Sequence, residues 1–183
     1  MQIIKYICLF VGLIMLSTGC SNVRKAVYDK KSRSELASTS KNTYARTPAA
    51  KEATVRSNLI STASKNLGTK YTYGGISPSE GFDCSGLIYY AAKSSQITLP
   101  RSSGTLADAA PHINWKTAEP GDLIFFGEGK KVNHVGIIER KKGNELWVIH
   151  STSSRGVISE DVLKSSYWNK RILFAIDFAT LMQ

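Results

Sequence analysis

A cysteine and two histidines are the residues of this 183-residue chain whose types and positions are best suited to chemistry. Cys84 follows a glycine-rich stretch and opens an apolar segment, which predicts that it begins a helix. The positive end of a helix dipole favours the thiolate form of cysteine, which is the nucleophilic form. His134 and His150 fall in two predicted strands, and a nearby histidine can activate such a sulfur. These three residues therefore predict a cysteine hydrolase.

Hydrolysis of an amide by a thiol also needs a proton carrier, a group that orients it, and hydrogen-bond donors for the oxyanion. We expect His134 to act first as general base and then as general acid. If the two strands are antiparallel neighbours, the His150 imidazole can meet His134 on one face and hold its tautomer. The Cys84 backbone N–H and the Tyr71 hydroxyl are the candidate oxyanion donors.

Other interpretations of these residues stay open at this stage. A lone histidine at a strand end is usually a hydrogen-bonded structural residue, and His112 is expected to be one. Tyr71 could equally pack in the core. Cys84, His134 and His150 could instead bind zinc, but the chain has no paired cysteines and no two histidines one helical turn apart. We therefore expect neither a metal nor an organic cofactor.

The first 20 residues have the proportions of a secretory signal. Lys5 supplies positive charge, and residues 7–16 are almost wholly apolar but too few to span a bilayer comfortably. The small residues before Cys20 resemble a bacterial lipoprotein signal. We expect residues 1–19 to be removed and Cys20 to be lipidated, which would anchor the protein to a membrane of the cell envelope. The alternative is an ordinary secretory signal with an incidental cysteine.

Positive charge is concentrated near the N-terminus of a chain whose formal net charge is +10. Residues 20–70 hold 11 Lys and Arg against 3 Asp and Glu, a net of +8, whereas residues 71–183 hold 12 against 11, a net of +1. Residues 20–50 are poor in large apolar side chains and predict a flexible basic linker. This linker either meets anionic lipid or cell-wall polymer, or is simply solvated. No basic stripe interleaved with aromatics is present, so we expect no nucleic-acid partner.

Residues 51–183 predict one domain of the α+β class. Helical periodicity covers 52–67, and Asp83 can cap a second helix that runs through Ala92. A glycine-rich loop lies between them, and residues 101–118 are expected to be irregular. Short strands are predicted at 123–126, 133–139, 145–151, 156–159 and 172–178. Helices followed by closely spaced strands favour helices packed on an antiparallel sheet.

Several short strings occur together in this order. They are Tyr71-Thr72-Tyr73-Gly74-Gly75, Phe82-Asp83-Cys84-Ser85-Gly86-Leu87, Leu99-Pro100-Arg101-Ser102-Ser103, Pro120-Gly121-Asp122-Leu123-Ile124-Phe125-Phe126, Asn133-His134-Val135-Gly136-Ile137 and Ile149-His150-Ser151. Over residues 55–178 the chain resembles the NlpC-type family of bacterial cell-wall endopeptidases, which are papain-like in fold. With its lipoprotein signal it looks most like the single-domain murein-hydrolase lipoproteins of that family.

The resemblance implies a catalytic triad of Cys84, His134 and His150, with Tyr71 near the oxyanion. It implies a papain-like α+β fold with the nucleophile helix packed on an antiparallel sheet. It also implies that the partner is peptidoglycan, cut at peptide bonds involving D-residues, often between D-glutamate and a diamino acid. We expect a monomer. A papain-like amidase or acyltransferase, or an inactive wall-binding lipoprotein, is the alternative.

Arg101 is a candidate for contact with substrate. Arginine pairs with carboxylates through two hydrogen bonds, and a stem peptide containing D-glutamate carries a free carboxylate. The alternative is that Arg101 only bonds carbonyl groups at the end of the nucleophile helix.

Overall fold

The structure is a computed structural model that describes residues 47–182, and the residues from Lys51 onward form one compact unit. The predicted signal peptide, the predicted lipidation residue Cys20 and the linker up to residue 46 lie outside the described residues. Within the part of the chain that is described, no helix is both long enough and apolar enough to cross a membrane.

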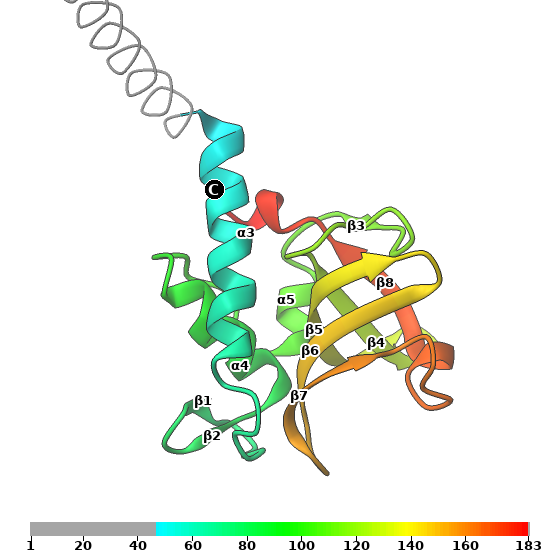
Figure 1. The fold of residues 1–183 in the computed structure, drawn as a ribbon. Coiled ribbons are helices and arrows are strands. Elements are labelled where there is room, and N and C mark those ends of the chain that lie inside the picture. The colour runs from blue at the N-terminus through cyan, green and yellow to red at the C-terminus, as the bar shows by residue number, and fades with distance from the viewer. Residues whose placement is uncertain (1–46, 183) are drawn as a thin grey trace, which may run out of the picture. The chain divides into compact units, whose positions relative to one another are not determined.

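Helices precede most of the strands along the chain, as Figure 1 shows. The helices are α3 (Pro48–Ser64), α4 (Cys84–Lys93) and α5 (Ser103–Ala107), with short 3-10 helices η1 (Asn169–Arg171) and η2 (Phe178–Leu181). The strands are β1 (Ile76–Ser77), β2 (Gly81–Phe82), β3 (His112–Ile113), β4 (Leu123–Glu128), β5 (Lys131–Lys142), β6 (Glu145–Thr152), β7 (Gly156–Asp161) and β8 (Ile172–Ile176). The predicted α+β class is confirmed.

Six of the strands form one sheet in the order β3-β8-β4-β5-β6-β7, and every neighbouring pair is antiparallel. The strands β4, β5, β6 and β7 follow one another both in the chain and in the sheet. This simple order is why the two strands that carry His134 and His150 are direct neighbours. The predicted antiparallel sheet is therefore confirmed.

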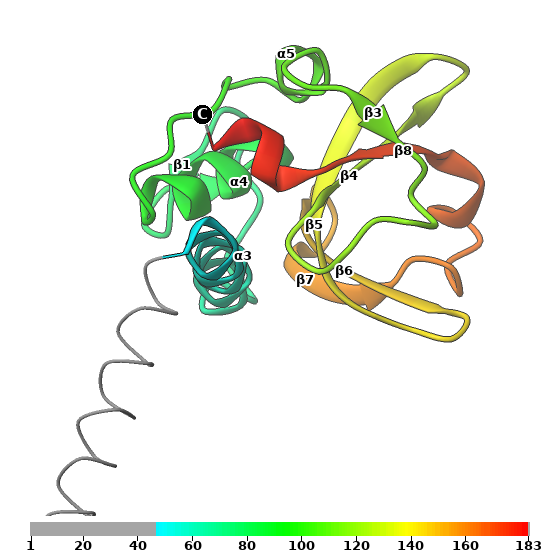
Figure 2. The same ribbon diagram turned by 90° about the horizontal axis from the view of Figure 1, so that it is seen from above.

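The two faces of the sheet bury different side chains, because successive residues of a strand point to opposite faces. Phe125, Val135 and Ile149 belong to the core cluster that also contains the buried side chains of α3 and α4. Figure 2 shows these two helices together on one side of the sheet. The alternate positions Phe126 and Val148 belong to a second cluster, which includes Trp168 from the segment after β7.

Several regions differ from the sequence expectations. The glycine-rich loop contains the two short strands β1 and β2, and α3 ends at Ser64 rather than residue 67. Helix α3 begins at Pro48 rather than residue 52, since proline is tolerated in the first turn of a helix and Thr47 Oγ1 accepts the Ala50 N–H at 3.2 Å. The stretch 101–118, expected to be irregular, contains α5 and β3. Both elements are too short to leave a hydrophobic period in the sequence.

Candidate active site

Cys84 is the first residue of α4, and the residue before it fixes the start of that helix. The Asp83 side chain accepts the Gly86 N–H at 2.7 Å and so acts as the predicted N-cap. Asp83 also accepts the Gly74 N–H at 2.9 Å, which ties the glycine-rich loop to the helix. The residue that precedes Cys84 is therefore bound both to the glycine-rich loop and to the first turn of α4, which fixes the backbone at Cys84.

Gly86 lets that loop approach the first turn of α4. A Cβ atom at Gly86 would lie 2.0 Å from the carbonyl oxygen of Gly75, which no real side chain tolerates. The glycine two residues after Cys84 is thus required by the close contact between the loop and the helix. This packing leaves Cys84 only 9% exposed.

His134 on β5 and His150 on β6 meet as the sequence predicted, with 2.9 Å between His134 Nε2 and His150 Nδ1. Both are buried, and His150 is completely so. Gly136 makes room for this pair, because a Cβ there would lie 2.4 Å from Val148 Cγ1 and 3.1 Å from His150 Cβ. A larger residue on this stretch of β5 would push the His150 side chain away from His134.

A carboxylate and an indole complete the surroundings of the histidines, and the sequence analysis gave neither a role. Glu160 Oε1 lies 3.0 Å from His150 Nε2 and accepts the Trp168 indole N–H at 3.0 Å. The Trp168 ring stacks on His134, with 4.5 Å between centroids and 24° between planes. Glu160 is recognised only from the strand register, since β7 pairs Ile158 with His150 and Glu160 follows two residues later on the same face.

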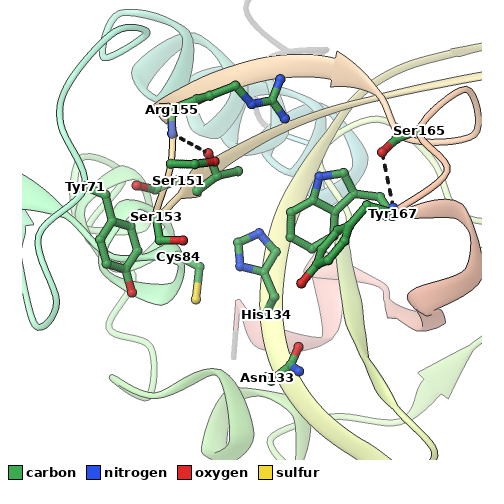
Figure 3. A pocket seen from close by; sticks show the side chains of 12 residues that line it. Tyr71, Cys84, Asn133, His134, Ser151, Ser153, Arg155, Ser165 and Tyr167 are labelled. Atoms are coloured by element: carbon green, nitrogen blue, oxygen red, sulfur yellow. Dashed lines mark hydrogen bonds between the residues drawn. The ribbon is translucent and has the colours of Figure 1, made fainter.

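A pocket of about 660 Å³ opens beside Cys84 and His134. Figure 3 shows the Cys84 sulfur and the His134 imidazole facing each other across it, with the Tyr71 ring beside Cys84. Its lining is rich in hydroxyl groups and consists of Tyr71, Cys84, Asn133, His134, Ser151, Thr152, Ser153, Ser154, Arg155, Ser165, Tyr167 and Trp168. The structure thus brings together all four residues named from the sequence, His150 lying behind His134.

The other two candidates from the sequence lie elsewhere. Arg101 donates to Asp83 from both terminal guanidinium nitrogens, Nη1 and Nη2, at 2.9 and 2.8 Å, and it is not among the residues that line the pocket. It therefore supports the start of α4 and not its C-terminal end, so that alternative was wrong. His112 is structural, since its Nε2 bonds the Ala107 carbonyl oxygen at 2.9 Å and its ring stacks on Phe174.

The electrostatic environment keeps both reacting groups neutral. Burial raises the pKa of the Cys84 thiol, and the negative charge of Asp83 raises it further. Burial, with the adjacent His150, lowers the pKa of His134 to about 3. Desolvation thus opposes the thiolate that the helix start was expected to favour, and it outweighs the backbone N–H groups near the sulfur.

The part of the chain from residue 47 to residue 182 contains His, Cys, Asp and Glu side chains, the types that ligate metal ions. No group of three or more His, Cys, Asp or Glu residues there is arranged to hold a metal ion. The two histidines direct ring nitrogens toward each other and toward Glu160 instead.

Comparisons with known proteins match this part of the chain. The model of the NlpC/P60 family matches residues 68–177. A gamma-DL-glutamyl hydrolase of Bacillus subtilis is 39% identical over 119 residues, which are 64% of this chain and 29% of that protein. The bifunctional muramidase/DL-endopeptidase CwlT of the same species is 38% identical over 63% of this chain and 34% of its own. Murein DD-endopeptidase MepH of Escherichia coli is 38% identical over 61% of this chain and 41% of its own.

The chain thus spans less than half the length of these curated relatives. Among solved structures, an NlpC/P60 family protein of Bacillus cereus has a TM-score of 0.61 at 31% identity, over 70% of this chain and 40% of that one. An NLP/P60 family protein of Staphylococcus aureus, described as similar to lipoprotein, has a TM-score of 0.58 at 32% identity, over 70% and 42%. These likenesses agree with the α+β fold of the structure.

Proposed function

Because the chain belongs to the NlpC/P60 family, we propose that it is a cysteine peptidase that hydrolyses the peptides of bacterial peptidoglycan. The observation that carries this proposal is the arrangement of Cys84 and His134 in one pocket, with His150 2.9 Å behind His134. Hydrolysis of an amide by a thiol uses a nucleophile, a proton carrier beside it and a group that orients the carrier.

The proposed reaction starts from a neutral thiol and a neutral imidazole. As the Cys84 sulfur attacks the carbonyl carbon, its proton passes to His134, and the oxygen takes up the negative charge. His134 then gives the proton to the leaving amine, the C–N bond breaks, and a thioester remains on Cys84. Water then attacks this thioester as His134 takes its proton, the C–S bond breaks, and His134 returns the proton to the Cys84 sulfur as the acid leaves.

Donors for the oxyanion lie at the start of α4 and beside it. The first N–H groups of a helix have no acceptor within the helix, and Cys84 is the first residue of α4. Tyr71 lines the same pocket, and burial together with the nearby Cys84 raises the pKa of its phenol. The Tyr71 hydroxyl therefore stays protonated at neutral pH and can donate a hydrogen bond to the oxyanion.

We further propose that the bond cut joins D-glutamate to a diamino acid. Two of the relatives bear names that refer to DL bonds, one of them to a glutamyl bond, and the hydroxyl-rich pocket suits a polar peptide. The MepH name refers to a DD bond, so cleavage of a DD cross-link is the second candidate.

Digestion of purified muropeptides by the full chain, followed by mass spectrometry of the products, tests both proposals. Cleavage at the DL bond gives fragments ending in D-glutamate, whereas cleavage of a DD cross-link converts dimers to monomers of unchanged stem. The Cys84→Ala protein serves as the control for contaminating hydrolases. Absence of any product, with the wild-type protein folded, would contradict the proposed activity.

We also propose that the protein is a lipoprotein of the cell envelope, anchored through Cys20. Small residues before Cys20 and a short apolar stretch before them support this. Cys20→Ala should release the protein from the membrane fraction without reducing its activity in a soluble assay. Unmodified Cys20 in the native protein, found by mass spectrometry, would contradict the anchor.

A further inference from the structure

We propose that Glu160 is a positioning residue, which through hydrogen bonds sets the tautomers of both histidines and leaves His134 Nδ1 free to accept the Cys84 proton. The effect on catalysis rests on the proposed function, whereas the tautomers themselves do not. The starting observation is the distance of 3.0 Å between Glu160 Oε1 and His150 Nε2.

The Glu160 carboxylate is held in place and kept ionised. The same oxygen accepts the Trp168 indole N–H at 3.0 Å and an Arg155 guanidinium N–H at 2.6 Å. The hydrogen bond from His150 and the contacts with Arg155 lower the pKa of Glu160 to about 2. An ionised carboxylate only accepts hydrogen bonds, so the proton in the bond to His150 belongs to His150 Nε2.

This assignment determines the next bond. A neutral imidazole carries one proton, and burial lowers the pKa of His150, which is therefore neutral at pH 7. With its proton on Nε2, His150 offers a bare Nδ1 to His134. The contact of 2.9 Å between His150 Nδ1 and His134 Nε2 is then an N–H···N bond donated by His134.

The proton positions in His150 and His134 determine which nitrogen of His134 can serve Cys84. His134 is also neutral, and because its proton lies on Nε2, its Nδ1 carries a free lone pair. Since Nε2 is directed to His150, Nδ1 is the ring nitrogen left to serve Cys84, which His134 faces across the pocket (Figure 3). The opposite tautomer of His150 would lose the bond to Glu160 and reverse the bond between the two histidines. The proton of His134 would then lie on Nδ1, which could not accept the thiol proton.

Trp168 links the carboxylate directly to His134. Its indole N–H is donated to Glu160 while its ring stacks on the His134 imidazole. If Glu160 were displaced, it would no longer fix the tautomer of His150 or hold the Trp168 ring against the His134 imidazole.

The first test needs no variant and no substrate. ¹⁵N chemical shifts of the imidazoles, measured near pH 7 on the uniformly labelled full chain, should show His134 and His150 both protonated at Nε2. His112 is an internal reference outside the pocket, since its Nε2 donates to a backbone carbonyl. A proton on Nδ1 of either His134 or His150 would overturn the proposal, whatever the substrate of the protein proves to be.

Three variants extend the test. Glu160→Met keeps the length of the side chain but removes the acceptor, so the His150 tautomers should mix and kcat on muropeptides should fall about tenfold or more with little change in KM. Glu160→Gln keeps an acceptor oxygen and should retain the wild-type tautomers with most of the activity. Glu145→Gln is the matched control. Glu145 also accepts hydrogen bonds from a tryptophan indole, that of Trp147, and from a charged side chain, that of Lys164, but it lies outside the histidine pair.

The outcomes separate this proposal from a structural role for Glu160. If the Glu160→Met protein, once folded, keeps wild-type tautomers and kcat, Glu160 does not position the histidines. If Glu160→Met does not fold, Glu160→Gln decides, since loss of the Nε2-protonated forms in that variant would contradict the proposal. If the wild-type protein shows the expected tautomers but neither it nor any variant cleaves muropeptides, the proposed function is contradicted and the tautomer assignment stands.

Discussion

Arg101 binds both carboxylate oxygens of Asp83, with 2.9 Å from Nη1 to Oδ1 and 2.8 Å from Nη2 to Oδ2. This pair joins the segment after α4 to the N-cap of the helix that begins with Cys84. The bidentate geometry and the positive charge lower the pKa of Asp83 in spite of its burial. Arg101 thus acts on the site through the backbone that carries the nucleophile.

Replacement of Arg101 by glutamine should therefore reduce stability. It leaves Asp83 without its charge partner, and because Arg101 is 38% exposed, we expect a loss of only about 1–2 kcal/mol in the free energy of unfolding. Chemical denaturation measures this loss. Glu145→Gln is the control, since the ion pair of Glu145 with Lys164 is on the surface and its loss should leave the midpoint nearly unchanged. An Arg101→Gln protein of wild-type stability with a raised KM would instead indicate contact with substrate.

The roles of His134 and His150 should differ in mutant kinetics. Removal of the proton carrier in His134→Ala should lower kcat/KM on muropeptides by about 10³-fold or more. Asparagine at position 150 can still form one hydrogen bond, so His150→Asn should cost less, about 10- to 10²-fold. Circular dichroism on both variants controls for unfolding, because both side chains are buried. More activity in His134→Ala than in His150→Asn would reverse the assigned roles.

The sequence predicted the part of the site that depends on the neighbours of each residue in the chain. Asp83 caps the helix of Cys84 by accepting an N–H three residues further along the chain, and the two histidines lie on consecutive antiparallel strands. Local patterns are sufficient for such relationships. The chemical roles assigned to these residues and to Tyr71 stay predictions until the variants are measured.

The rest of the site depends on contacts between distant segments or on the exact register of neighbouring strands. Trp168 reaches His134 from a segment without regular strands, whose path no hydrophobic period reveals. The role of Glu160 follows only from the register of β6 and β7, and the Arg101–Asp83 pair from the packing of a loop on a helix start. Burial also raises the pKa of Cys84, and burial of a residue beside polar neighbours is not visible in the sequence.

Activity should extend to acidic pH. The reaction needs neutral His134, and the pKa of that residue is lowered from the usual histidine range to about 3, so the neutral form persists as the pH falls below 6.5. We expect kcat/KM on a soluble muropeptide to stay nearly constant from pH 7 to pH 5. Circular dichroism over the same range checks that the protein stays folded. A loss of activity with a midpoint near pH 6.5 would show that His134 is solvated as an ordinary histidine.

Gly136 should be intolerant of even a methyl group. A Cβ there would lie 2.4 Å from Val148 Cγ1 and 3.1 Å from His150 Cβ, so Gly136→Ala must shift β6 or turn His150 away from His134. We expect a loss of about 1–3 kcal/mol in the free energy of unfolding, measured by denaturation, with a fall in kcat on muropeptides.

Gly104→Ala is the matched control for this glycine. Gly104 lies in the short helix α5, and a Cβ there would meet no atom within 4 Å. Alanine also restricts the unfolded chain, so this variant should be neutral or more stable by about 0.4–1 kcal/mol, with unchanged kcat. If Gly136→Ala behaved like Gly104→Ala in both measurements, the close contact between β5 and the His150 side chain would not be what holds the two imidazoles together.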